Sequence, residues 1–186
     1  MQVPEELVEA CRRGDPAAFE ELVRTTHRAV YTLVYRIVGN PDDAADVTQD
    51  VYVRVWRGLR GFRGDANLAT WLYRIAANTS LTHVKRRART AAPVDPAELP
   101  EEPAEDRTEQ QGDADVLERA LARLPEQQRA VVVLKDIYGW TCAEIGEQMG
   151  TTEGAIKVRL FRARQRLADD LAATGVIVPM KRKRAR

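Results

Sequence analysis

Apolar residues recur at helical spacing through most of the chain, and strand-like alternation is almost absent. Asp15 followed by Pro16 predicts a helix start, with an N-cap and a proline at the first helical position. The apolar periodicity then continues until Gly39, where the sequence 39–41 ends one helix and begins the next. The pattern predicts helices over about 4–13, 16–38, 41–57 and 68–87, with a glycine-containing loop at 58–65. These segments predict an all-helical N-terminal domain.

Residues 88–113 differ from the sequence on either side. They contain four prolines, eight carboxylates and few large apolar side chains. Such a segment cannot bury enough apolar surface to offset its ordering entropy, so a flexible acidic linker is expected. The chain is therefore predicted to be all-α, with two small helical domains at 1–90 and 114–175, a linker at 91–113 and a basic tail at 176–186.

The second domain has the punctuation of a helix-turn-helix. A helix is expected over about 125–138, ended by Gly139. Thr141 and Glu144 then form a capping-box pattern that starts a short helix over 142–149. Gly150 permits a left-handed turn, and Thr152 can cap a longer helix that continues to about residue 171. A short helix, a glycine turn and a longer basic helix are typical of a DNA-binding helix-turn-helix.

The long C-terminal helix is expected to bury one stripe and present a basic surface. The predicted buried stripe is Ile156, Leu160, Ala163, Leu167 and Leu171. The opposite face holds Ala155, Val158, Phe161, Arg162 and Gln165, with Lys157 and Arg164 on one flank and Arg159 and Arg166 on the other. Basic flanks toward phosphates and a mixed face toward base edges would suit the major groove. The alternative is an ordinary solvated basic face.

Two helices of the first domain carry further candidate surfaces. On 68–87, Trp71, Arg74 and Asn78 cluster on one side, and Leu81 and Lys85 continue it. Aromatic, amide and basic groups suit an unstacked single strand, although Trp71 could instead belong to the core. On 41–57, a mixed acidic and basic face is typical either of protein docking or of a solvated surface. That face contains Asp46, Gln49, Asp50, Val53, Arg54 and Arg57.

The charge of the whole chain hides its distribution. The net charge is +1, but residues 1–87 carry 13 basic and 11 acidic side chains, 88–113 carry 2 and 8, and 114–186 carry 14 and 9. Two cationic domains thus flank one anionic segment. No apolar run approaches the roughly 20 residues of a membrane span, and no signal segment is evident, so a cytoplasmic protein without membrane insertion is expected.

Catalytic and metal chemistry have little support in the sequence. Cys11 and Cys142 are isolated and are expected to be packing residues, and His27 and His83 have no ligand or triad pattern around them. We therefore expect no enzyme activity, no catalytic residues, no metal and no cofactor.

Three motifs, in this order and spacing, resemble the extracytoplasmic-function (ECF, group IV) sigma factors of bacterial RNA polymerase. They are the acidic run from Asp42 to Tyr52, the segment from Phe62 through Trp71 to Asn78, and the stretch from Leu124 to Arg164. The resemblance extends from about Phe19 to Leu171 and implies a sigma-2 domain followed by a sigma-4 domain. It implies a promoter-specificity subunit that recognises the minus-35 element as duplex and melts the minus-10 element.

The resemblance also implies roles for individual residues. The helix over 41–57 would dock on core RNA polymerase through Asp46, Gln49, Asp50 and Arg54. The minus-10 single strand would meet Arg63, Trp71, Arg74, Asn78 and Lys85, with Asn78 as a reader of a flipped base. The minus-35 duplex would meet Lys157, Val158, Arg159, Phe161, Arg162 and Arg164. An anti-sigma factor is a further expected partner, and the acidic linker would occupy the RNA-exit path.

Two other interpretations stay open at this point. A stand-alone helix-turn-helix regulator would bind duplex operators by itself, without polymerase. A helical adaptor protein with incidental basic surfaces would have a function that does not depend on DNA.

Overall fold

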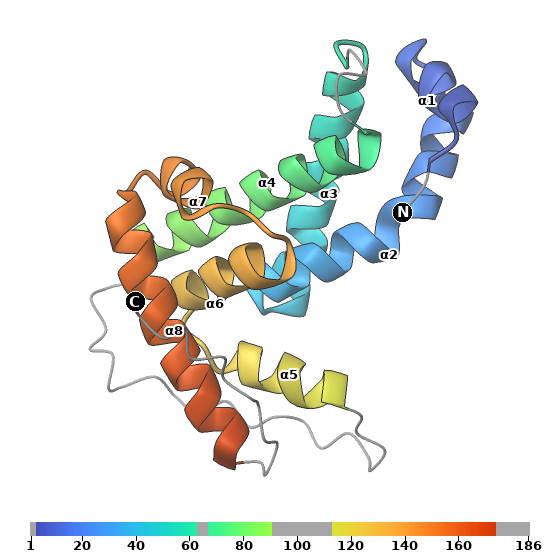
Figure 1. Ribbon diagram of the computed structural model, residues 1–186. Coiled ribbons are helices and arrows are strands. Elements are labelled where there is room, and N and C mark those ends of the chain that lie inside the picture. The colour runs from blue at the N-terminus through green and yellow to red at the C-terminus, as the bar shows by residue number, and fades with distance from the viewer. Residues whose placement is uncertain (1–2, 63–66, 91–112, 174–186) are drawn as a thin grey trace.

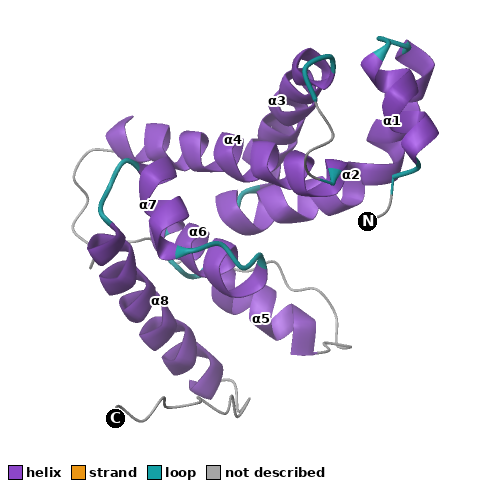
Figure 2. Ribbon diagram, turned by 45° about the horizontal axis from the view of Figure 1, so that its top comes forward, coloured by secondary structure: helices purple, strands orange, loops and turns teal. Residues whose placement is uncertain are grey.

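The computed structural model describes residues 3–62, 67–90 and 113–173, and within these ranges every regular element is a helix (Figures 1 and 2). The predicted acidic linker, the basic tail and Arg63 lie outside the described residues. The first four helices, here called the N-terminal module, are α1 (Glu5–Arg12), α2 (Pro16–Val38), α3 (Pro41–Leu59) and α4 (Leu68–Thr90). The C-terminal module comprises α5 (Asp113–Ala122), α6 (Glu126–Val132), η1 (Val133–Ile137), α7 (Cys142–Met149) and α8 (Glu153–Ala173).

The helix starts of the N-terminal module follow the predicted chemistry. The Asp15 side chain accepts from the amides of Ala17 and Ala18, and the Asn40 side chain accepts from Asp42 and Asp43. Each cap satisfies donors that have no partner within the helix. Both helices also carry proline in the first turn, where the missing amide hydrogen is not needed.

Long apolar stripes bring α2, α3 and α4 together. The inward stripe of α3, formed by Ala44, Val47, Val51 and Val55, is buried to 3% exposure or less. Leu22, Val30 and Leu33 of α2 and Leu72 of α4 pack into the same cluster. This packing leaves the outer face of α3 exposed, and it leaves Trp71, Arg74, Asn78 and Lys85 of α4 outside the set of fully buried residues.

The helix predicted over 125–138 changes its geometry part of the way along. It is α-helical to Val132 and then forms a π-helical turn, η1, from Val133 to Ile137. Gly139 has φ +75°, and the Trp140 amide donates to the carbonyl of Leu134 at 2.9 Å. The helix therefore ends at the glycine that was expected to end it. The sequence pattern had predicted the ends of this helix but not its wider last turn.

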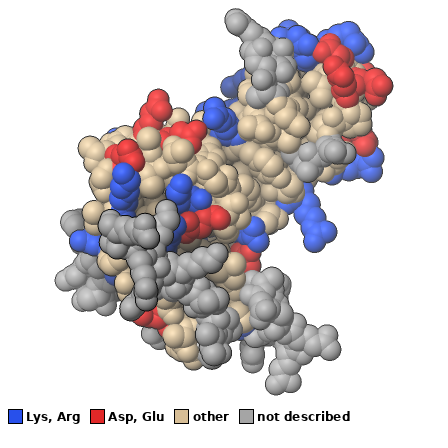
Figure 3. Space-filling view, viewed as in Figure 1, with Lys and Arg blue, Asp and Glu red and all other residues tan. Residues whose placement is uncertain are grey.

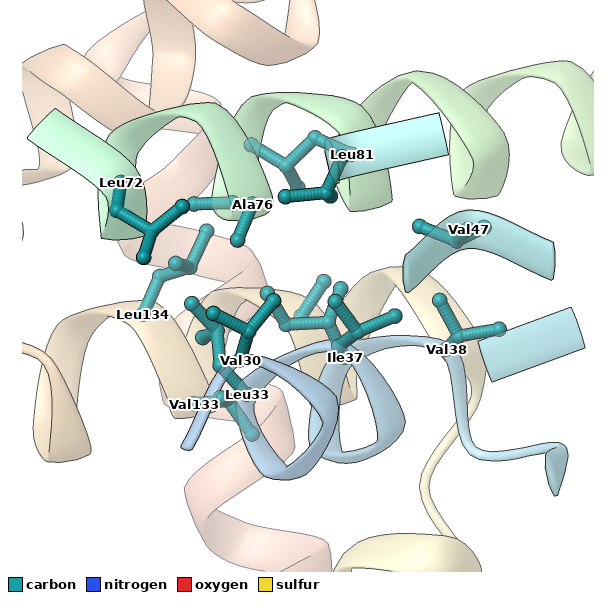
Figure 4. Packing of buried hydrophobic residues seen from close by; sticks show 14 of the residues in the cluster. Val30, Leu33, Ile37, Val38, Val47, Leu72, Ala76, Leu81, Val133 and Leu134 are labelled. Carbon is teal, nitrogen blue, oxygen red and sulfur yellow. The ribbon is translucent and has the colours of Figure 1, made fainter. Parts of the chain in front are cut away.

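The two modules pack on each other across one apolar core, which the sequence did not predict. Val133 and Leu134 of the C-terminal module are fully buried in the cluster that contains Val30, Leu33 and Ile37 of α2 (Figure 4). Figure 1 shows α6 beside α2 and α7 against the C-terminal half of α4, and contacts between both pairs confirm this placement. The core therefore continues from one module into the other.

Candidate nucleic-acid and polymerase interface

The outer face of α3 carries the four residues predicted to dock on a protein partner. Asp46, Gln49, Asp50 and Arg54 are all exposed on this helix. Val53 is 43% exposed and Trp56 is 37% exposed. Apolar groups among charges are typical of a protein-binding surface, since they bury area while the charges select the partner. The sequence had missed Trp56, although its spacing of three residues from Val53 places both on neighbouring positions of one helix face.

The candidate single-strand face lies on α4 and divides into two parts. Near the start of the helix, Trp71 is half-buried against Phe62, with ring centroids 5.2 Å apart. A Cβ at Gly58 would lie 2.9 Å from the Trp71 ring, so the glycine makes room for the indole. Trp71 thus packs against its own module while keeping part of its ring accessible.

Further along α4, Arg74 is exposed, and Asn78 and Lys85 are half-buried. The Asn78 Oδ1 atom is buried and has no hydrogen-bond partner among the described residues. Leu81 is only 1% exposed, so the prediction that it continues this face was wrong. Its position on the helix points it into the core, where the C-terminal half of α4 packs on α2 and α3.

The helix-turn-helix forms with the predicted caps. The Thr141 hydroxyl accepts from the amide of Glu144 at 3.1 Å, and the Glu144 carboxylate accepts from the amide of Thr141 at 2.8 Å. The Glu144 carboxylate also accepts from the Thr141 hydroxyl, and the two hydrogen bonds that it accepts stabilise its charged form and lower its pKa. Gly150 has φ +66°, and the Thr152 hydroxyl accepts from the amide of Ala155 at the start of α8. The turn is tight because a glycine occupies its left-handed position.

The reading face of α8 is open to solvent. Phe161 is 64% exposed and Val158 is 52% exposed, the two most exposed large apolar side chains among the described residues. Arg162 lies beside them and is also exposed. The predicted stripe is buried, with Leu167 only half-buried. Two exposed apolar side chains within one basic helix surface suit contact with base edges, including thymine methyl groups.

The basic flanks of α8 are partly paired with carboxylates. Lys157 Nζ lies 2.7 Å from Glu153, and Arg164 Nε donates to Asp136 at 3.0 Å. Each pairing raises the pKa of the basic group. Arg159 differs, because it is half-buried against Met149 and burial lowers its pKa. Phosphates would therefore compete with local carboxylates for Lys157 and Arg164.

Acidic and basic side chains are interspersed over the face seen in Figure 3. Between α3 and α4 lies a hollow of about 60 Å³, lined by Asp50, Arg54, His83 and Arg86 among others. Its volume suits a few water molecules rather than an organic cofactor. Within the described ranges no cluster of metal-ligating side chains is found. No helix in those ranges is long and apolar enough to span a bilayer.

The comparisons with known proteins agree with this geometry. Residues 22–90 match the Sigma-70 region 2 family, and residues 114–167 match the Sigma-70 region 4 family. The chain is 39% identical over 164 residues to the ECF RNA polymerase sigma factor SigM of Mycobacterium tuberculosis, covering 88% of this chain and 82% of the relative. It is 33% identical over 179 residues to the RNA polymerase sigma-H factor of Pseudomonas aeruginosa, covering 87% and 90%.

A solved structure has a similar arrangement of helices. It is that of the sigma factor RpoE in complex with the anti-sigma factor NepR from Bartonella quintana, with a TM-score of 0.54 and 25% identity, covering 83% of this chain and 96% of the other. Sequence and structure together define a two-region, all-helical transcription factor of the sigma-70 type. The chain belongs to the ECF sigma factors of bacterial RNA polymerase.

Proposed function

We propose that this chain is the promoter-specificity subunit of a bacterial RNA polymerase holoenzyme and itself carries no catalytic site. The observation that carries the proposal is α8, where Val158 and Phe161 stand exposed between basic flanks at the end of a capped helix-turn-helix. Similarity to both sigma-70 regions supports a joint role in polymerase docking and promoter reading. The chain would act in the cytoplasm, where polymerase and chromosome meet.

Three surfaces would share the work. The outer face of α3 would bind core polymerase through Asp46, Gln49, Asp50 and Arg54, with Trp56 adding apolar area. The exposed face of α8 would read duplex minus-35 DNA through Val158, Phe161 and Arg162, with Lys157, Arg159 and Arg164 toward phosphates. The face of α4 would capture the minus-10 strand through Trp71, Arg74, Asn78 and Lys85, with Arg63 nearby in the sequence. Binding a flipped base would offset the few kcal/mol that unstacking costs.

The separation of roles follows from the chemistry of each face. The α8 face offers Val158, Phe161 and Arg162 on one helix surface between basic flanks, which suits insertion into a major groove. The α4 face offers the Trp71 ring and an Asn78 oxygen that lacks a partner, which suit an extruded base better than a base pair. The polymerase would catalyse RNA synthesis, and this chain would select the promoter and separate its strands.

We also propose an anti-sigma factor as a partner. The support is the likeness to a sigma factor solved in complex with one, in which the matched region covers 96% of that chain. A pull-down from cells that express the tagged chain, followed by mass spectrometry, tests this. Recovery of a stoichiometric non-polymerase partner that inhibits transcription is the expected result, and recovery of polymerase alone would contradict it.

A gel-shift comparison tests the main proposal against a stand-alone regulator. Duplex promoter fragments are mixed with the chain alone, with core polymerase alone and with both. The expected result is a specific, heparin-resistant complex only with both. A specific complex with the chain alone would favour the stand-alone regulator. Phe161→Ala should weaken this complex, and Asp169→Ala, at an exposed position near the other end of α8, is its matched control.

A further inference from the structure

One arginine joins the two modules through backbone carbonyls. Arg129 of α6 is 5% exposed, and its guanidinium donates to the carbonyls of Ile37 and Val38 at the end of α2. The same guanidinium donates to Ala122 and Leu124 at 3.3 Å each. The last carbonyls of a helix have no partner within it and carry its negative dipole end, so a buried cation satisfies them well.

The α2 end is shaped for this arginine. Gly39 caps α2 with φ +78°, and a Cβ at this position would overlap the Arg129 guanidinium. Gly39 therefore has two reasons to lack a side chain, its left-handed backbone and the space that Arg129 fills. Burial lowers the pKa of Arg129, and among the described residues no carboxylate forms an ion pair with it. Its charge is held by carbonyl dipoles instead.

Among the described residues, three ion pairs cross the same interface with one polarity. Arg36 Nε donates to Glu118 at 2.7 Å, Arg74 lies 3.3 Å from Glu144, and Arg87 lies 3.3 Å from Glu126. In each pair the N-terminal module provides the arginine and the C-terminal module provides the glutamate. The hydrogen bond to Glu118 raises the pKa of Arg36. The C-terminal module thus presents anionic groups to cations of α2 and α4, as a phosphate backbone would.

These contacts cover part of the candidate minus-10 face. Helix α7 packs along α4, where Glu144 pairs with Arg74 and a Cβ at Gly150 would lie 2.8 Å from Lys85 Nζ. Asn78 lies between Arg74 and Lys85 on this side of α4, half-buried and with its Oδ1 unpartnered. A strand that stacked along this face would have to displace α7.

We propose that the C-terminal module covers the strand-capture face of α4 as an intramolecular cap. Arg129, which donates to the carbonyls at the end of α2, holds this cap closed. Glu144 takes the place of a nucleic-acid phosphate on Arg74. The inference rests on the proposed function of the α4 face, but the closed arrangement can be tested without transcription. Opening exposes the apolar groups of η1 and breaks the Arg129 contacts, so the closed form is favoured until another surface replaces them.

The cap leaves the other two surfaces accessible. Asp46, Gln49, Asp50 and Arg54 on α3 are exposed in the closed form, as are Val158 and Phe161 on α8. Polymerase can therefore dock on α3 before the α4 face becomes available. If about nine-tenths of the chains that are not bound to polymerase are in the closed form, their apparent affinity for a single strand falls about tenfold.

A side chain introduced at Gly39 tests the cap, and the same substitution at Gly139 is the matched control. Gly39→Asn keeps a residue that tolerates the left-handed backbone but puts its side chain where Arg129 lies. Gly139→Asn has nearly the same φ, +75°, and nothing within 4 Å of an added Cβ. Circular dichroism confirms that each full-length variant is helical and unfolds cooperatively before binding is measured.

Module separation is followed by energy transfer between dyes on cysteines introduced at exposed Arg28 and Asp169. The native Cys11 and Cys142 are buried. Strand binding is followed by fluorescence anisotropy with a short single-stranded DNA of mixed sequence. Gly39→Asn is expected to lower energy transfer and tighten strand binding by up to about tenfold, whereas Gly139→Asn matches the wild type in both. Gly39→Asn with unchanged energy transfer and unchanged binding would overturn the proposal.

A charge swap provides a second, independent arm. Arg36→Glu and Glu118→Arg should each open the cap, and the double variant should close it again, because the pair is restored with reversed polarity. Failure of the double variant to recover energy transfer would contradict an electrostatic role for this pair. Opening without tighter strand binding would keep the closed arrangement but reject α4 as the strand-capture face. That last result would count against the proposed function and not against closure.

Discussion

Asn78→Ala should separate the functional role of Asn78 from any structural one, because the two effects have opposite signs. The Asn78 Oδ1 atom is buried and finds no hydrogen-bond partner in the part of the chain that the structure describes. An unsatisfied buried acceptor costs the folded state about 1–3 kcal/mol. Replacing Asn78 with alanine removes that atom, and its side chain forms no hydrogen bond with any described residue that the change would break. The free energy of unfolding should therefore stay the same or rise.

Strand capture should change in the other direction. An amide that reads a base edge contributes about 1–3 kcal/mol of binding, which corresponds to about 5- to 150-fold in the equilibrium constant. Open-complex formation by the holoenzyme should fall by a factor in that range. Binding to a duplex minus-35 fragment should stay near the wild-type value, since Val158 and Phe161 are untouched.

The assay combines permanganate footprinting of the melted strand with urea unfolding of the free chain. Leu81→Ala is the matched control, because Leu81 lies on the same helix and is 1% exposed. That variant should lose about 2–5 kcal/mol of stability and retain strand capture per folded molecule. Equal losses of minus-10 melting and minus-35 binding in Asn78→Ala would refute the reasoning. So would a large loss of stability in that variant.

Three further perturbations address the other surfaces. Arg54→Glu, on the exposed α3 face, should weaken core polymerase binding by about tenfold or more with an unchanged melting temperature, and Arg28→Glu on α2 should leave both unchanged. Phe161→Ala should lower minus-35 duplex affinity of the holoenzyme by about tenfold with unfolding unaffected, because the ring is 64% exposed; a stability loss would contradict this. The pKa of Glu144 is lowered from 4.5, so its contribution to stability is present above that pH and is lost as the pH falls through the folded value. The stability difference between the wild type and Glu144→Gln should therefore shrink in urea titrations below about pH 4.5, and a constant difference would rule this linkage out.

Local chemistry in the sequence predicted most of the helix boundaries. Asp15 and Asn40 each precede a proline, Thr141 lies three residues before Glu144, and each of the three side chains caps the helix that follows it. Helix α7 begins and ends where its capping box and Gly150 predicted. These features are local, so a single sequence contains them.

The contacts between the modules could not be predicted in this way. Val133 and Leu134 have the apolar character of any helix interior, and nothing in their spacing shows that they bury against Leu33 of α2. Arg129 is separated from Ile37 by 92 positions, and it bonds to carbonyls that any residue could provide. Such a contact depends on backbone shape rather than on a sequence pattern. The pairing of Arg74 with Glu144 is invisible for the same reason.

The candidate site was predicted in part. Helical spacing placed Val158, Phe161 and Arg162 on one face of the C-terminal helix, and the structure shows all three exposed on α8. The sequence pattern placed Leu81 on the binding face of α4, because its aromatic and basic neighbours suggested one continuous surface. In the structure Leu81 is buried in the core. The carboxylate partners of Lys157 and Arg164 were also missed, although Glu153 lies four residues before Lys157 and follows the usual helical spacing.

Promoter-dependent transcription in a purified system tests the central claim most directly. Core RNA polymerase is incubated with a fragmented genomic library, with and without the full-length chain, and the 5′ ends of the transcripts are mapped. A promoter-specificity subunit should give a limited set of new start sites, each preceded by the same two spaced sequence elements, and Arg54→Glu should abolish them. Transcripts identical with and without the chain would contradict the account, as would new start sites that share no upstream elements.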